Sequence, residues 1–328
     1  MRWFLSRLAF YVFALWVALT VSFLLPRVMP GDPIAGVLQH LSPAQLASNP
    51  GIIKTYETLL GGGHQSLLAA YWQYLGRAAH LNFGISTSNY PTPVGEVVGR
   101  TLPYSLVLVG IAFALAFLIG TAIGMVAAWR RGGSFDSIFV PIFMALSAFP
   151  AYFSALLLVY FLGLKLNWFP IQHAYGNEVN PGWNWAFITS AIKHGILPAL
   201  TIVVAFAGGW VLNMRTVMIN TMSEDYVAMA QAKGLRDRRV MTRYAARNAI
   251  LPPLNGFAAQ FATAVGGVIF IELVFSYPGA GYTLQQAALG NDYPLTQALL
   301  LIFAICPIVA NFIMDVFNLI LDPRVRTA

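Results

Sequence analysis

Charged side chains are scarce in this sequence of 328 residues. Only 9% of the residues are charged, whereas 58% are hydrophobic. Soluble domains carry about 25% charged residues, because a water-exposed surface must be covered with polar groups. The shortage therefore excludes an ordinary soluble protein and predicts that lipid covers much of the chain.

Cysteine and nucleotide-binding motifs are nearly absent as well. The single cysteine, Cys306, lies in an apolar run, which excludes an intrachain disulfide and a cysteine metal site. No phosphate-binding G-x-x-x-x-G-K-[ST] motif occurs, since Lys233 and Gly234 stand in the reverse order, and no H-E-x-x-H zinc motif occurs. The net charge of +7 is spread over short stretches between apolar runs, which argues against nucleic-acid binding. We expect no catalytic residues, no metal site and no cofactor bound by this chain.

Long apolar runs are abundant by contrast. A helix needs about 20 apolar residues to cross a bilayer core, and six stretches meet this requirement. They are Leu8–Pro26, Thr101–Trp129, Ser137–Leu166, His194–Met218, Pro252–Phe275 and Leu295–Leu321. No small-residue cleavage site follows the first run, so we interpret it as a retained helix rather than a signal peptide. The sequence predicts an all-α integral membrane protein with six transmembrane helices.

Lysine and arginine predict the orientation, because positively charged loops stay in the cytoplasm. With the N-terminus inside, twelve basic residues fall in inner segments and six in outer segments. Both termini are therefore predicted to be cytoplasmic.

Two outer segments contain aromatic residues. In the polar segment 30–100, Leu68, Tyr71, Trp72 and Leu75 recur at helical spacing and predict a short amphipathic helix on the membrane face. The second outer loop carries Trp168, Phe169, Trp183 and Trp185. We interpret these aromatics as headgroup-level anchors, with direct contact to a transported solute as the alternative.

The long polar segment on the inner side, residues 220–251, has the pattern of two short helices. Thr221 and Glu224 have the spacing of a capping box, and Gly234 is expected to end the first helix. Asp237 is expected to cap a second helix over Arg238–Asn248. Such a helix pair suits docking to another protein. A basic loop that merely follows the positive-inside rule is the alternative.

The same segment resembles a known motif. Its matching residues are Glu224, Asp225, Tyr226, Ala228, Ala230, Ala232, Lys233, Gly234 and Leu235, and later Ala246, Arg247, Asn248, Ala249, Leu251 and Pro252. These resemble the EAA loop of binding-protein-dependent ABC importer permeases, in the form found in the dipeptide, oligopeptide and nickel branch. Further matches are Met29–Pro33, Phe169–Gln172, Phe275–Gly279 and Leu321–Arg324. Met229 departs from the arginine frequent in this branch, and the stretch from Gly234 to Pro252 is longer than in sugar importers.

The resemblance implies an architecture and a set of partners. Residues 1–29 hold the cytoplasmic N-terminus and first helix, 30–100 an extracytoplasmic segment, 101–321 the transmembrane core with its coupling loop at 220–251, and 322–328 a cytoplasmic tail. The implied partners are a second homologous permease, one or two cytoplasmic ABC ATPase subunits and an extracytoplasmic substrate-binding protein. ATP and Mg²⁺ are expected on the ATPase subunits. The implied location is a bacterial or archaeal cytoplasmic membrane.

The solute is the least determined property. Peptide is the first hypothesis, oligosaccharide the second, and nickel and opines also occur in the branch. Glu272, Trp168 and Tyr282 are the candidates for lining the substrate pathway. Few ionisable groups lie in the spans, which argues against an ion-coupled secondary carrier, and no catalytic pair supports an intramembrane enzyme.

Packing between the spans has its own candidates. Among the ionisable groups in the spans, Arg215 and Asp315 are a hypothetical pair. Gly120 and Gly124 have the spacing that permits close helix approach, and Gly208, Gly209, Gly266 and Gly267 are expected to act similarly.

Overall fold

The computed structural model describes residues 2–28, 51 and 66–321. These residues form helices joined by turns and loops, and their only β-type pairing is an isolated bridge between Ile85 and Pro93. The expected all-α fold is confirmed. The chain divides into two compact units, one with the described residues of 1–105 and 278–312, the other with 106–277 and 313–321. The segments 29–50 and 52–65 and the tail after Leu321, on which several predictions fall, lie outside the described residues.

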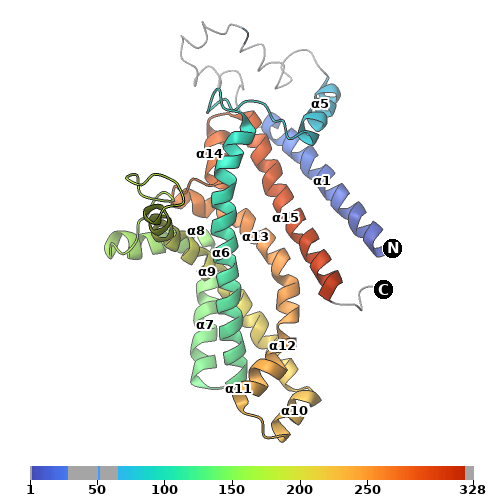
Figure 1. Cartoon of the computed structure of the whole chain (residues 1–328), viewed down its shortest axis with the longest axis vertical. Helices are drawn as coiled ribbons and strands as arrows, with labels where there is room; N and C mark the ends of the chain where they lie inside the picture. Colours follow the sequence, from blue (N-terminus) through green and yellow to red (C-terminus); the bar gives the residue numbers. More distant parts are fainter. Residues whose placement is uncertain (1, 29–50, 52–65, 322–328) are drawn as a thin grey trace. The chain divides into compact units, whose positions relative to one another are not determined.

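The predicted spans are found as helices with shifted ends. Five helices in the described residues are long and apolar enough to cross a membrane, and a bent helix pair raises the number to six. The five are α1 (Arg2–Val28), α6 (Val94–Trp129), α9 (Trp185–Met222), α13 (Leu251–Val274) and α15 (Tyr293–Leu321). Figure 1 shows them as the long ribbons of the fold.

The third predicted span, Ser137–Leu166, is not one straight helix. It is divided into α7 (Ser134–Ala148), α8 (Ala151–Leu158) and a π-helical segment η1 (Val159–Lys165), with a bend of 103° at the break. Phe149 is extended, with ψ of 135°, and Pro150 follows it. A proline disfavours helical backbone in the preceding residue, which explains the break.

In the first unit, the amphipathic helix is confirmed as α5 (Leu67–Ala79). It packs on α1, where the hydroxyls of Tyr71 and Tyr74 pair with those of Thr20 and Ser22 at 2.7 and 2.8 Å. The ring of Phe23 contacts both tyrosines. Of the apolar residues that predicted this helix, Leu68 and Trp72 remain exposed.

A buried carboxylate organises the remainder of the first unit, which holds α14 (Ala280–Leu289) and the start of α15. Asp292 accepts a hydrogen bond from the backbone N–H of Leu295 at 3.2 Å and so caps α15. Its other oxygen accepts bonds from the Ser86 hydroxyl at 2.5 Å and the Ser88 N–H at 2.9 Å. Asp292 thus ties the loop after α5 to the start of α15.

The core of the second unit is aromatic and lies among α6, α9 and α13. The rings of Phe113 and Phe117 on α6 meet Trp210 on α9 and Phe257 on α13, with centroids 4.9–6.0 Å apart. Phe113 and Trp210 are almost fully buried. This cluster joins α6 to α9 and α13, the two helices between which the segment described next lies.

Glycine explains how closely these helices approach. A Cβ at Gly120 would lie 2.5 Å from the Trp210 Cβ, and one at Gly124 would lie 3.0 Å from the Met214 Cβ, so the predicted close-approach motif is confirmed. Gly208 is in close contact with α7, where its N–H donates to the Ser147 hydroxyl at 2.9 Å. The prediction is wrong for Gly209, Gly266 and Gly267, where an added Cβ would meet nothing within 4 Å.

Candidate coupling region

The coupling region is the chain of short helices between α9 and α13. It contains α10 (Asp225–Ala232), α11 (Asp237–Arg239), the π-helical segment η2 (Val240–Ala245) and α12 (Ala246–Ala249). Figure 1 shows these helices at one end of the second unit, below α7 and α9. Two short helical stretches separated by a turn are what the sequence predicts.

The predicted capping box at the start of the region is wrong. Thr221 still belongs to α9, where its hydroxyl donates to the Val217 carbonyl at 2.9 Å. Glu224 itself is the N-cap of α10, with extended backbone and no side-chain capping bond. The helix ends as predicted, because Lys233 is its C-cap and Gly234 follows with a positive φ of 71°.

One side of α10 is buried and holds the helix in place. Val227 and Ala230 pack with Met214 and Met218 of α9 and with Val240, Ala245 and Ala249 of the following helices. Leu235 packs on the edge of this cluster. Val227 and Ala230 are three residues apart and lie on the same face of the helix, so α10 is attached to the second unit along this face.

The opposite side of α10 is exposed and carries most of the predicted site residues. Tyr226 is 38% exposed and Met229 59% exposed. Besides Tyr226, the exposed members of the predicted set are Glu224, Asp225, Ala228, Lys233, Gly234, Arg247 and Asn248. The structure therefore presents these residues on an accessible surface, whereas Ala230 is buried and Leu235 is partly buried.

The second helical stretch differs from its prediction in two details. Asp237 is the first residue of α11 rather than its cap, and the turn from Val240 to Ala245 is π-helical. The Asn248 carboxamide donates to the Tyr226 hydroxyl at 2.9 Å. This bond connects two predicted site residues that are 22 positions apart in the sequence.

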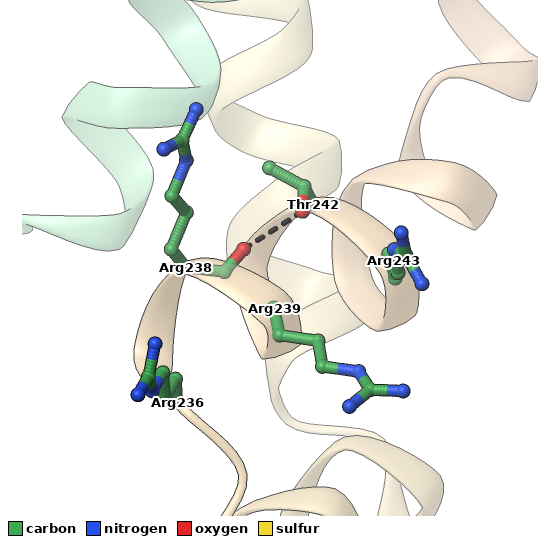
Figure 2. A pocket seen from close by; sticks show the side chains of 5 residues that line it. All are labelled: Arg236, Arg238, Arg239, Thr242 and Arg243. Carbon is green, nitrogen blue, oxygen red and sulfur yellow. Dashed lines mark hydrogen bonds between the residues drawn. The ribbon is translucent and has the colours of Figure 1, made fainter.

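An arginine-rich pocket of about 450 Å³ opens on this second stretch, lined by Arg236, Arg238, Arg239, Thr242 and Arg243. The Thr242 hydroxyl donates to the Arg238 carbonyl at 2.7 Å. Figure 2 shows the guanidinium groups pointing in different directions rather than toward one centre. Within the described residues none of the four arginines forms an ion pair. The pocket is thus a positively charged surface without an internal counter-charge.

The region continues directly into α13. The N–H of Ile250 donates to the Ala246 carbonyl and the N–H of Leu254 to the Ile250 carbonyl, both at 3.0 Å. The prolines after Leu251 stand at the first positions of α13, where their missing N–H groups have little effect. A continuous hydrogen-bonded backbone therefore connects α12 to α13.

An ion pair connects α9 with α7, and it corrects the predicted partner of Arg215. Arg215 on α9 pairs with Asp136 on α7, through bonds of 2.6 and 2.8 Å, and not with Asp315. Asp136 also accepts the N–H of Gly132 at 3.1 Å. Sequence reasoning missed Asp136, although its place in the first turn of α7 favours a carboxylate.

The three candidate pathway residues have different surroundings. Glu272 on α13 is fully buried, and its carbonyl accepts the N–H of Tyr277 at 2.8 Å. Trp168 is 64% exposed in the loop after η1. Tyr282 lies on α14 in the first unit. Their contact with a solute stays a prediction.

Two segments of the predicted resemblance, far apart in sequence, meet in the second unit. The N–H of His173, which follows Phe169–Gln172, donates to the carbonyl of Phe275 at 3.0 Å. Phe275 is almost fully buried. The loop before α9 is thereby attached to the end of α13.

Comparison with known proteins decides the family. Residues 120–327 match the family described as the binding-protein-dependent transport system inner membrane component. The chain belongs to this family. The match contains the whole coupling region and α13. It is a multi-pass transport component.

Named relatives of this inner membrane component extend over nearly the full chain. It is 30% identical over 307 residues to the oligopeptide transport system permease protein AppB of Bacillus subtilis, with 93% of each chain covered. It is 30% identical to the dipeptide transport system permease protein DppB of Lactococcus lactis and 28% identical to the glutathione transport system permease protein GsiC of Escherichia coli K12, each with 99% of both chains covered. The resemblance to the dipeptide and oligopeptide branch of ABC importer permeases is confirmed.

Proposed function

We propose that this chain forms half of the translocation pathway of an ATP-driven peptide importer and couples that pathway to cytoplasmic ATPase subunits. The names of the relatives above, which refer to oligopeptide, dipeptide and glutathione transport, support peptide as the solute. A second homologous permease completes the pathway, one or two ATPase subunits supply energy, and an extracytoplasmic binding protein delivers the peptide. ATP and Mg²⁺ bind to the ATPase subunits.

The observation that carries the coupling role is the two-sided character of α10. Its buried face is fixed to α9 and α12, while Asp225, Tyr226 and Met229 are exposed. A helix that docks into a cleft of an ATPase subunit requires such an arrangement, because the free face binds while the other face transmits force. Movement of α10 then shifts α12, and the continuous backbone at Ile250 moves α13.

The charge of the coupling region supports its placement in the cytoplasm. Arg236, Arg238, Arg239 and Arg243 surround the open pocket, and positively charged loops remain on the cytoplasmic side. This orientation places both chain ends in the cytoplasm. It also leaves these four guanidinium groups, which form no ion pair among the described residues, available to carboxylates on the ATPase surface.

Reconstitution of the assembled complex tests this proposal. The chain is co-expressed with its neighbouring genes, purified, and placed in proteoliposomes with the binding protein inside or outside. We expect a second permease and ATPase subunits to co-purify, and ATP hydrolysis to rise on addition of peptides. If oligosaccharides stimulate ATP hydrolysis and peptides do not, the transported solute is an oligosaccharide, the second hypothesis. A chain that purifies without ATPase subunits would overturn the coupling role.

A further inference from the structure

The exposed face of α13 is unlike that of a lipid-facing helix. Its buried face consists mainly of aliphatic residues such as Val265, Val268 and Ile271. Between Leu251 and Phe270, which are its exposed large apolar residues, the exposed positions are Pro252, Asn255, Ala259, Gln260, Thr263 and Gly266. These positions recur every three or four residues and form a polar and small-residue stripe along the helix.

Another span of the same unit provides the contrast. On α6 between Leu106 and Ile119, every exposed position is a large aliphatic residue, as in Ile111, Leu115 and Leu118. That composition suits contact with lipid tails. The stripe on α13 therefore reflects a different environment and not a general property of the spans.

The polar positions lie deep in the span. The 24 residues of α13 extend over about 36 Å, slightly more than a bilayer core. Gln260 stands nine residues after Leu251, about 14 Å along the helix, and Thr263 lies one turn further. Both are near the middle of the span.

The carboxamides of this stripe are those of Asn255 and Gln260. In the described part of the chain, neither Asn255 nor Gln260 makes a side-chain hydrogen bond. The Thr263 hydroxyl donates to the Ala259 carbonyl at 3.3 Å. Burying an unpaired carboxamide in hydrocarbon is unfavourable, so a face with two of them is not expected to contact lipid.

We propose that this stripe, with Asn255, Gln260 and Thr263 as its polar positions, lines the aqueous translocation pathway and binds the main chain of the passing peptide. This rests on the proposed function. A carboxamide donates and accepts hydrogen bonds, which matches the N–H and C=O groups that every peptide carries whatever its sequence. The side chains are neutral, so they do not hold charged peptides by ion pairing. Gly266 has open space beside it and leaves room for a solute.

The stripe is also connected to the coupling region. Asn255 lies one turn after Leu251, where α13 continues from α12 through the hydrogen bonds at Ile250. Movement of the coupling helices thus reorients the helix that carries the polar stripe. The exposure of the stripe to solute should accordingly change with the nucleotide state of the ATPase subunits.

Thiol accessibility tests the pathway directly. In a Cys306→Ser background, Gln260→Cys and Thr263→Cys are compared with Leu115→Cys and Leu118→Cys from the exposed apolar face of α6. The assembled complex in proteoliposomes is treated with a charged, membrane-impermeant methanethiosulfonate reagent. We expect the α13 cysteines to react at least about 10-fold faster than the α6 cysteines, because only water-exposed thiols ionise. Their rates should also differ between nucleotide-free and vanadate-trapped complexes.

Slow and equal reaction of the α13 and α6 cysteines in both nucleotide states would overturn the proposal that the stripe lines the translocation pathway. The stripe would then face lipid or pack against the second permease. That failure leaves the proposed function intact if peptides still stimulate ATP hydrolysis. If the α13 cysteines react fast in a complex that transports oligosaccharides, the stripe does face water, but the proposal that it binds peptide is wrong.

A pair of substitutions tests recognition of the solute. Gln260→Leu removes the carboxamide at similar size and should lower peptide uptake by about 10-fold, the effect of one lost hydrogen bond. Gln260→Asn keeps a carboxamide and should recover most of the uptake. Uptake is normalised to assembled complex, so that a folding defect is separated from lost binding. Equal uptake by Gln260→Leu and the unchanged protein would overturn the binding role.

Discussion

At the scale of single residues, the pair between Arg215 and Asp136 is the clearest stabilising interaction of the second unit. The Asp136 side chain is 8% exposed and that of Arg215 is 25% exposed. The contacts are bidentate, and Asp136 also receives the Gly132 N–H. The carboxylate thereby connects the turn between α6 and α7 with the inner part of α9.

Asp136→Asn should destabilise the protein by about 2–3 kcal/mol, below the range for fully buried pairs, because Arg215 keeps some contact with solvent. The matched control is Glu96→Gln, which disrupts the exposed pair with Arg100 and should change stability by about 0.5 kcal/mol or less. The measurement is the thermal unfolding midpoint of each purified variant in detergent. Equal shifts for the two variants would contradict a special role of Asp136.

Gly234 is the residue at which backbone conformation bears on coupling. Its φ is +71°, a region that β-branched residues rarely adopt, and an added Cβ would meet no neighbour within 4 Å. Gly234→Val therefore acts through backbone strain of about 1–2 kcal/mol rather than through a clash. We expect peptide uptake per ATP hydrolysed to fall by about 10-fold in proteoliposomes.

Gly234→Asn is the control, because asparagine tolerates positive φ and should retain most of the coupling. If valine and asparagine behave alike, the turn at Gly234 does not set the position of α10.

At the scale of elements, the contact between α6 and α9 depends on two glycines. A Cβ at Gly124 would lie 3.0 Å from the Met214 Cβ and 3.1 Å from the Arg215 backbone nitrogen. Since backbone atoms do not move aside as a flexible side chain does, the helices must separate to admit it. The same separation would disturb Met214 and Met218, which hold α10.

Gly124→Ala should therefore destabilise the protein by about 1–3 kcal/mol, as expected for overpacking. Gly110→Ala on the same helix is the matched control, because nothing lies within 4 Å of its added Cβ. That change should be neutral or slightly stabilising, since alanine favours the helix. Thermal unfolding in detergent distinguishes the two, and a smaller effect at Gly124 than at Gly110 would count against close packing of α6 on α9.

At the scale of the whole molecule, the described residues contain spans, a coupling surface and a polar stripe, but ionisable groups are few within the spans. Glu272 and the pair of Asp136 with Arg215 are buried or paired inside the second unit. A secondary carrier needs groups that bind and release its coupling ion during transport. Energy for accumulation is therefore expected from the ATPase partners.

The purified chain, reconstituted without ATPase subunits, should show no peptide accumulation under an imposed proton or sodium gradient. The complete complex with ATP and binding protein is the control and should accumulate peptide. Gradient-driven accumulation by the chain alone would contradict an importer subunit and favour a secondary carrier.

The sequence by itself determined the membrane class, the approximate spans and the two short helical stretches between α9 and α13. Long apolar runs, the positive charge of the loops and the turn at Gly234 are local sequence patterns, so they can be recognised without knowledge of the fold. The partner of Arg215, the approach at Gly208 and the meeting of His173 with Phe275 were decided by the tertiary structure, because each joins residues distant in sequence. The same holds for the polar stripe of α13. Its residues are visible in the sequence, but only packing determines which side of a helix is left exposed.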